Sequence, residues 1–230
     1  MSARGLVLLA LMLLPAAQGC KDARHDAAAV EATASKAELA TPAPAPAPAE
    51  PKEPAPAPKT ASNTAAAPSI YELSAKLEDQ TGKALALDAF RGRPVVVSMF
   101  YSGCKAMCPL LITRLQGIEA ALPKEARDST QFLLISFDPE RDTPQNLTAL
   151  ATAHAIDTTH WSLTRTSASS VQEIAAVLDI RYRRLPNGEF AHSSIVTVLD
   201  RAGLPVLRGE DSELVPGEVA KVIAGVLQTP

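Results

Sequence analysis

Two cysteines separated by three residues stand out in the stretch VVVSMFYSGCKAMCPLL, where an apolar run leads into Cys104 and Cys108. The chain has three cysteines, and the third, Cys20, lies near the N-terminus. Thiolates act as nucleophiles, exchange with disulfides and bind soft metal ions. A spacing of three residues lets two sulfurs close into a disulfide or diverge around an ion. Redox chemistry and metal binding therefore both stay open for this pair.

The simplest alternative is that Cys104 and Cys108 form a disulfide that only stabilises the fold. Closing a ring of about five residues would stabilise the fold by roughly 2 kcal/mol, against about 4.7 kcal/mol for a 100-residue loop. The pair is therefore poorly placed as a structural cross-link. We expect Cys108 at the start of a helix, where unpaired backbone N–H groups, the helix dipole and the nearby Lys105 would favour its thiolate.

The chemistry of two thiolates narrows the metals that this pair could hold. No second cysteine pair is present to complete a four-cysteine zinc or iron–sulfur site. Copper(I), in contrast, accepts few and soft ligands. A third ligand would then be expected from a histidine.

The four histidines differ in their sequence surroundings. His25 lies in a low-complexity segment, His154 continues the apolar face of a predicted helix, and His160 falls in a predicted loop. His192 follows a Pro-Asn-Gly turn and stands just before a predicted core strand. His192 is thus the candidate ligand, with a capping or surface histidine as the alternative.

The N-terminus predicts export. Residues 1–19 have one arginine and then an apolar run that is shorter than the ~20 residues of a bilayer span, so they are predicted to form a signal peptide. Small residues before Cys20 predict cleavage there and attachment of lipid. The alternative is an ordinary secreted protein in which Cys20 is incidental.

Residues 20–68 are mostly Ala, Pro, Thr, Ser, Lys and Glu, a composition with too little apolar surface to offset the chain entropy. They are predicted to be a disordered Ala/Pro-rich tether before a single domain at 69–230. The formal net charge of −3 on 230 residues gives no reason to expect a nucleic-acid partner.

The domain has an α/β pattern. Apolar runs at 93–101 and 131–138 predict buried strands, and 193–200 with 205–209 predict a hairpin. Helical periodicity follows at 111–122, 147–151, 171–178 and 219–226, and Thr143 with Pro144 is a typical helix start. This order predicts early parallel strands and a final antiparallel pair. Cys104, Cys108 and Asp138 then lie near the carboxyl ends of strands, where such sheets place their sites.

Three motifs in series resemble the SCO/SenC family of copper-binding, thioredoxin-like proteins that help to assemble the CuA centre of cytochrome c oxidase. They are the C-x-x-x-C-P at Cys104, the DPERDTP that begins at Asp138, and the HSS that begins at His192. The resemblance covers the domain from about Tyr71. It implies a thioredoxin-like mixed sheet flanked by helices, with Cys104, Cys108 and His192 as copper ligands and Asp138 beside them. Arg141 and Asp142 are interpreted as loop structure and helix entry.

The resemblance implies a metallochaperone rather than an enzyme that turns over a substrate. Its partner would be the oxidase subunit that bears CuA, or another exported copper acceptor, and a lipid anchor would hold it on the periplasmic or extracytoplasmic face of a membrane. The main alternative is a thiol–disulfide oxidoreductase that keeps the acceptor's cysteines reduced, with Cys104 as the attacking thiol and Cys108 resolving. A Cys–His–Asp hydrolase and a peroxide-reducing enzyme are weaker alternatives.

Overall fold

The computed structural model describes residues 68–229 of the chain. The predicted signal peptide, the lipidation site at Cys20, His25 and nearly all of the predicted tether lie outside the described residues. No helix within 68–229 has the length and apolar character that a membrane span requires.

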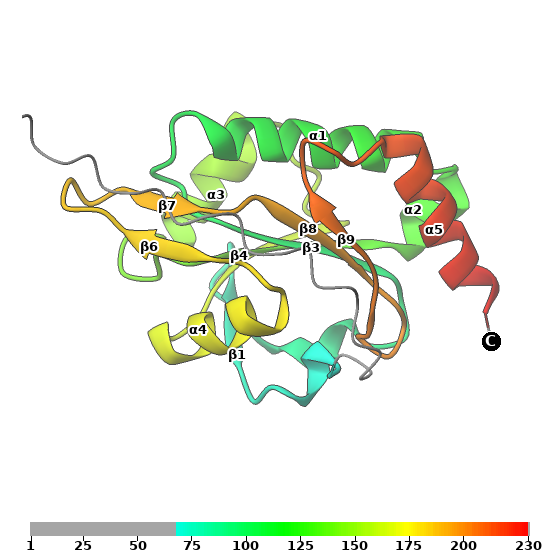
Figure 1. Cartoon of the computed structure of the whole chain (residues 1–230), viewed down its shortest axis with the longest axis horizontal. Helices are drawn as coiled ribbons and strands as arrows, with labels where there is room; N and C mark the ends of the chain where they lie inside the picture. Colours follow the sequence, from blue (N-terminus) through cyan, green and yellow to red (C-terminus); the bar gives the residue numbers. More distant parts are fainter. Residues whose placement is uncertain (1–67, 230) are drawn as a thin grey trace, which may run out of the picture. The chain divides into compact units, whose positions relative to one another are not determined.

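Nine strands, five α-helices and two short 3-10 helices make up the described part (Figure 1). The strands are β1 (Lys76–Asp79), β2 (Ala84–Ala86), β3 (Val95–Phe100), β4 (Gln131–Ser136), β5 (Trp161–Arg165), β6 (Tyr182–Arg184), β7 (Phe190–His192), β8 (Ile195–Leu199) and β9 (Pro205–Glu210). The helices are α1 (Met107–Ala121), α2 (Lys124–Ser129), α3 (Pro144–Ala153), α4 (Ala168–Val177) and α5 (Pro216–Gln228), with 3-10 turns η1 (Ile70–Glu72) and η2 (Leu87–Phe90).

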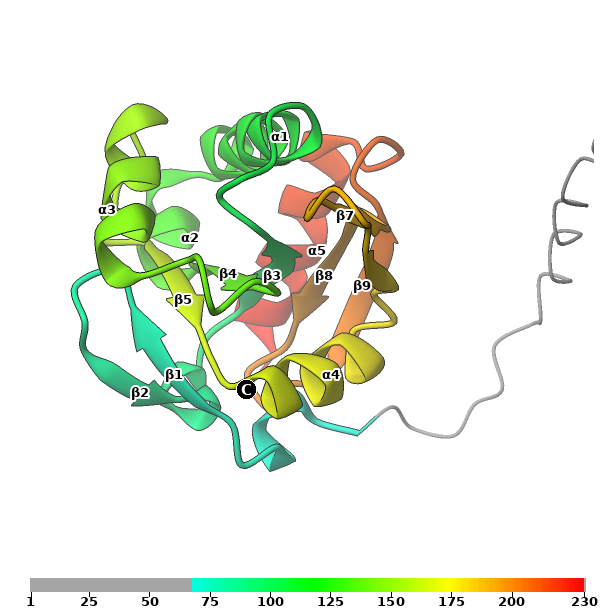
Figure 2. The same ribbon diagram turned by 90° about the vertical axis from the view of Figure 1, so that its left-hand side faces the viewer.

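Seven strands form one mixed sheet in the order β2-β1-β5-β4-β3-β8-β9. Strand β4 pairs in parallel with β3 and β5, whereas β8 pairs antiparallel with both β3 and β9. Every residue of β3 and β4 is buried, as expected for central strands that are covered on both faces. Figures 1 and 2 show α1, α3 and α5 on one face of the sheet and α4 on the other. The α/β prediction, with parallel early strands and a final antiparallel pair, is confirmed.

Helix α3 begins as the sequence predicts. Thr143 is its N-cap, and the Thr143 hydroxyl accepts a hydrogen bond from the backbone N–H of Asn146. Pro144 occupies the first helical position, where a missing N–H costs nothing. The residues of DPERDTP are thereby held between the end of β4 and the start of α3.

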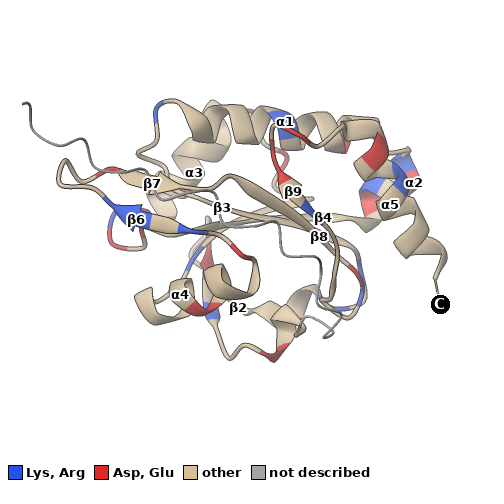
Figure 3. Ribbon diagram, viewed as in Figure 1, with Lys and Arg blue, Asp and Glu red and all other residues tan. Residues whose placement is uncertain are grey.

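Strands β6 and β7 form a separate two-stranded sheet that stands apart from the main sheet. The turn between them contains Gly188 at φ 82°, a left-handed conformation that glycine adopts at little cost. We call residues 182–192 the histidine hairpin. Arg181 just before it, and Arg183 and Arg184 on β6, are exposed, and Figure 3 shows these basic positions around β6. The exposure of these three arginines is that of a solvated hairpin.

Candidate metal centre

The cysteines lie where β3 ends and α1 begins. Cys104 sits in the loop after the strand, and its backbone N–H donates to the carbonyl oxygen of Tyr101 at 3.3 Å. Cys108 is the second residue of α1 and is only 2% exposed, whereas Cys104 is partly exposed. We call residues 101–108 the cysteine loop. Both thiols are free in this structure.

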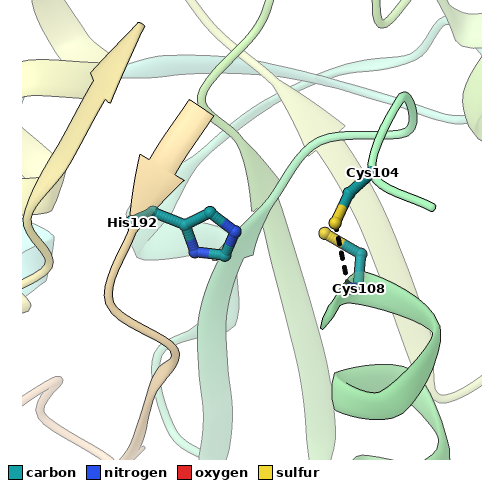
Figure 4. Close-up of side chains that lie close together, drawn as sticks. All are labelled: Cys104, Cys108 and His192. Carbon is teal, nitrogen blue, oxygen red and sulfur yellow. Dashed lines mark hydrogen bonds between the residues drawn. The ribbon is translucent and has the colours of Figure 1, made fainter. Parts of the chain in front are cut away.

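The N-terminus of α1 acts on Cys104 rather than on Cys108. The backbone N–H of Cys108 donates to the Sγ of Cys104 at 3.3 Å (Figure 4). Burial alone would raise the pKa of Cys104, but hydrogen bonds from the N–H groups of residues 106–108 and from the Cys108 thiol outweigh it and hold this pKa below its usual value. Burial raises the pKa of the Cys108 thiol. The prediction that the helix start favours a Cys108 thiolate is therefore wrong.

His192 is the last residue of β7 and pairs across the histidine hairpin with Tyr182. Its imidazole Nδ1–H donates to the carbonyl oxygen of Ser193 at 3.1 Å. In the neutral ring this tautomer leaves Nε2 free as a ligand atom. The ring points from the hairpin toward the two sulfurs (Figure 4).

The three predicted ligands converge. One donor atom from each of Cys104, Cys108 and His192 lies within 4.8 Å of the others, and no further group of three or more such donors occurs among residues 68–229. Two thiol sulfurs and one imidazole nitrogen form a soft donor set with no carboxylate in it. That set fits copper(I), which tolerates three-coordination, better than it fits zinc, which is held by four ligands in structural sites.

An aromatic cluster surrounds the imidazole. The rings of His192 and Phe137 lie 4.9 Å apart, and those of His192 and Tyr101 lie 6.1 Å apart, edge to face. Phe137 also packs against Tyr182 at 5.5 Å and against Phe190 at 5.0 Å. Phe137 and Tyr101 are buried. These rings form an apolar wall that limits water on one side of the three donors.

Asp138 lies close to this centre but outside the cluster of three donors. Its carboxylate is buried and forms an ion pair with Arg141. Asp138 is not a member of the donor cluster found among the described residues, so its role beside the metal stays a prediction.

Asp142, interpreted from the sequence as helix entry, also contacts the cysteine loop, and this contact was not predicted. It is fully buried, and its carboxylate accepts hydrogen bonds from the N–H and hydroxyl of Ser102 in the cysteine loop and from the hydroxyl of Ser136 in β4. Burial raises the pKa of Asp142. The sequence signal was the pair of serines, Ser136 as the last residue of β4 and Ser102 two residues after the end of β3.

The other histidines of the described part do not reach the centre. His154, which continues the apolar face of a predicted helix in the sequence, is the C-cap of α3 and is half-buried. His160 lies in the turn before β5, 3.8 Å from a carboxylate oxygen of Asp128. Of the described histidines, only His192 joins the two thiols.

Comparison with known proteins agrees with this geometry. A family model described as SCO1/SenC matches residues 65–228. A candidate copper-binding protein of Stutzerimonas stutzeri is 32% identical over 72 residues, which make up 31% of this chain and 35% of that protein, so the match spans about a third of the relative's length.

Solved structures show the same fold. A SCO1/SenC family lipoprotein from Bacillus anthracis has a TM-score of 0.63 at 20% identity, with 68% of this chain and 95% of that chain covered. ScoI of Bradyrhizobium japonicum with copper bound has a TM-score of 0.57 at 21% identity, with 66% and 96% covered. The family model matches more than half of the residues of this chain, and the chain therefore belongs to the SCO1/SenC family.

Proposed function

We propose that this protein is a copper-binding assembly factor that holds copper through the Cys104 and Cys108 thiolates and the His192 imidazole. Sco proteins are a family of cytochrome c oxidase assembly proteins, and the recipient would be the oxidase subunit that bears the CuA centre. One observation carries the proposal: Cys108 and His192 lie 84 positions apart in the sequence, yet the cysteine loop and the histidine hairpin place three soft donors within 4.8 Å.

The unequal exposure of the two sulfurs suits transient binding. Cys108 lies on the buried side of the centre, and Cys104 lies at its rim. An incoming thiolate of the acceptor could displace the Cys104 sulfur first, while Cys108 and His192 still hold the ion. Copper is thus passed by exchange of one ligand at a time, so that it is never released as a free ion.

Copper(I) titration of the reduced protein without oxygen, against a chelator of known affinity, tests this function. We expect one ion per chain, and His192→Ala should weaken binding tenfold or more, since loss of support for a bound metal commonly costs that much. His154→Ala is the matched control, because His154 is also half-buried but lies away from the centre. Equal affinities of the two variants would contradict the proposed ligand set.

A thiol–disulfide oxidoreductase is the second candidate function, and the two cysteine environments favour it specifically. The partly exposed Cys104 has a lowered pKa, as an attacking thiol requires, and the buried Cys108 is placed to resolve a mixed disulfide. The His192→Ala variant separates the two functions in cells. If it binds copper weakly yet restores oxidase assembly fully, reduction of the acceptor is the function and copper delivery is not.

We also propose that the mature chain begins at a lipid-bearing Cys20, which would tether the domain to the outer face of a membrane. The support is the short apolar run before Cys20 and the lipoprotein nature of the relative from Bacillus anthracis. Mass spectrometry of the purified N-terminus tests this proposal. An unmodified chain that begins at another residue would overturn it.

A further inference from the structure

We propose that residues 138–142, which we call the bracket loop, set the distance between the cysteine loop and His192 through two separate contacts. Asp142 holds the cysteine loop, and Arg141 holds the histidine hairpin. The inference deepens the proposed function, because it assigns positioning residues to the same copper site. None of these residues supplies a metal ligand.

The first contact joins the bracket loop to the cysteine loop. Both carboxylate oxygens of Asp142 accept from the backbone N–H of Ser102, at 3.2 and 3.1 Å, and the Ser102 hydroxyl donates to the same carboxylate. The Ser136 hydroxyl fixes the other side of the carboxylate. Ser102 lies two residues before Cys104. Since Asp142 is fully buried, its carboxylate is shielded from water, and the path of the chain into Cys104 is fixed from β4.

The second contact joins the bracket loop to the histidine hairpin. The Arg141 guanidinium pairs with the buried carboxylate of Asp138 and also donates from Nη2 to the carbonyl oxygen of Gly188 at 2.6 Å. It lies 5.8 Å from the centre of the Phe190 ring. Gly188 is in the hairpin turn, and Phe190 stands two residues before His192. Arg141 therefore reaches both the tip and the inner face of the hairpin.

The bracket loop is itself held firmly at both ends. The backbone N–H of Asp142 donates to the carbonyl oxygen of Asp138 at 3.0 Å, and the Ser136 hydroxyl accepts from the N–H of Asp138 at 2.9 Å. Helix α3 begins immediately afterwards with the capped Thr143. The backbone that carries Arg141 and Asp142 is therefore held in place, so their side chains can position the histidine hairpin and the cysteine loop.

The histidine hairpin needs such a contact more than the cysteine loop does. A two-stranded sheet by itself is marginally stable in water, and β6 and β7 pair only with each other. The hairpin packs on the body through the ring of Phe137 and through the ring of Tyr101, which lies 5.1 Å from the Phe190 ring. The cysteine loop, in contrast, continues directly from the buried strand β3 into α1. The rings of Tyr101 and Phe137 still pack on the hairpin when either contact of the bracket loop is lost, so we expect the two contacts to fail independently.

Hydrogen exchange of the metal-free reduced protein tests this independence. Asp142→Asn should speed exchange of the amides at 102–106 and leave those at 182–192 unchanged, whereas Arg141→Ala should do the reverse. Arg141→Lys should give an intermediate result, since an ammonium group can pair with Asp138 or reach Gly188 but lacks the fork that does both. Two substitutions away from the site serve as controls. Asp200→Asn changes a carboxylate that accepts hydrogen bonds within the turn between β8 and β9, and Arg208→Ala removes one hydrogen bond to the Val177 carbonyl oxygen.

Copper(I) affinity and the reduction potential of the Cys104–Cys108 pair complete the test. Asp142→Asn and Arg141→Ala should each bind copper(I) roughly tenfold more weakly than the wild type, which is the usual cost of losing a residue that supports a metal ligand. The potential should move in Asp142→Asn and stay unchanged in Arg141→Ala, because only the former frees the cysteine loop. Exchange that rises equally in both segments, or in neither, would overturn the bracket. If the wild-type protein bound no copper, the proposed function would fail, while the exchange result would still decide the bracket.

Discussion

The cysteine loop and the histidine hairpin contribute to one centre but are built differently. The cysteine loop joins a fully buried strand of the seven-stranded sheet to a 15-residue helix. The histidine hairpin is a separate pair of three-residue strands with exposed arginines. The thiols are therefore presented by the rigid core, and the imidazole is presented by a small appended element. A site that must both hold and release an ion gains from this division, since His192 can move without disturbing the fold.

Removal of a sulfur should have the largest effect. Cys104→Ser and Cys108→Ser should each abolish tight copper binding, because one thiolate and one imidazole leave too little soft donation for copper(I). The metal content after dialysis measures this result, with Cys20→Ser as a control that should keep one ion per chain. Full occupancy in the Cys108→Ser protein would place the metal elsewhere and remove the cysteine loop from the account.

The sequence identified the cysteine loop better than the hairpin. Strands β3, β4, β8 and β9 and helices α1, α3, α4 and α5 follow from long apolar patterns, and the structure confirms them. The five other strands were missed. Two of them, YRR and FAH, are too short and too polar to show alternation. Their conformation depends on pairing with each other and on the Phe137 ring, which no local pattern encodes.

The burial of Cys108 could also have been predicted from the sequence. Cys108 stands at helical spacing from Leu111, Ile112 and Leu115, all of which are buried, so its side chain lies on the core face of α1. That spacing predicts a buried thiol with a raised pKa. The helix N-terminus alone would favour a thiolate at Cys108, but its N–H groups turn toward Cys104. The role of Asp142 required knowing that the ends of β3 and β4 are neighbours.

The free-energy cost of removing a phenylalanine ring should differ between the main core and the histidine hairpin. Phe137→Ala should cost about 3–5 kcal/mol of unfolding free energy, as for other buried aromatic residues. Phe190→Ala on the hairpin should cost only about 1 kcal/mol, because Phe190 is half-buried and packs at the edge of the core. Urea unfolding followed by circular dichroism measures both. A cost for Phe190→Ala equal to that for Phe137→Ala would show that the hairpin is part of the main core after all.

The smallest expected effect is on the pH dependence of thiol reactivity. Because the pKa of Cys104 is lowered, its alkylation rate should reach half of its maximum below the ~8.5 of a free cysteine. Cys108, with its raised pKa, should react only above that pH. Mass spectrometry of the reduced protein after brief alkylation at each pH distinguishes the two. Faster labelling of Cys108 would contradict the assignment of the helix N–H groups to Cys104.

The raised pKa of Cys108 also predicts how the stability of the fold depends on pH. The pKa of Cys108 is raised in the folded state, so the folded protein keeps this proton at a pH where the unfolded chain loses it. The contribution is fully present below about pH 8.5 and declines as the pH rises above that value. Urea unfolding between pH 7 and 10 should therefore show a loss of stability in the reduced wild type that is smaller in Cys108→Ser. An identical decline in both proteins would show that another group causes it.

X-ray absorption at the copper edge tests the central claim most directly. The reduced protein, loaded with one equivalent of copper(I) without oxygen, should give a first coordination shell of two sulfur atoms and one nitrogen atom. The nitrogen contribution should disappear in His192→Ala and persist in His154→Ala. A shell of sulfur alone in the wild type, or a nitrogen contribution that survives in His192→Ala, would contradict a centre built jointly from the cysteine loop and the histidine hairpin.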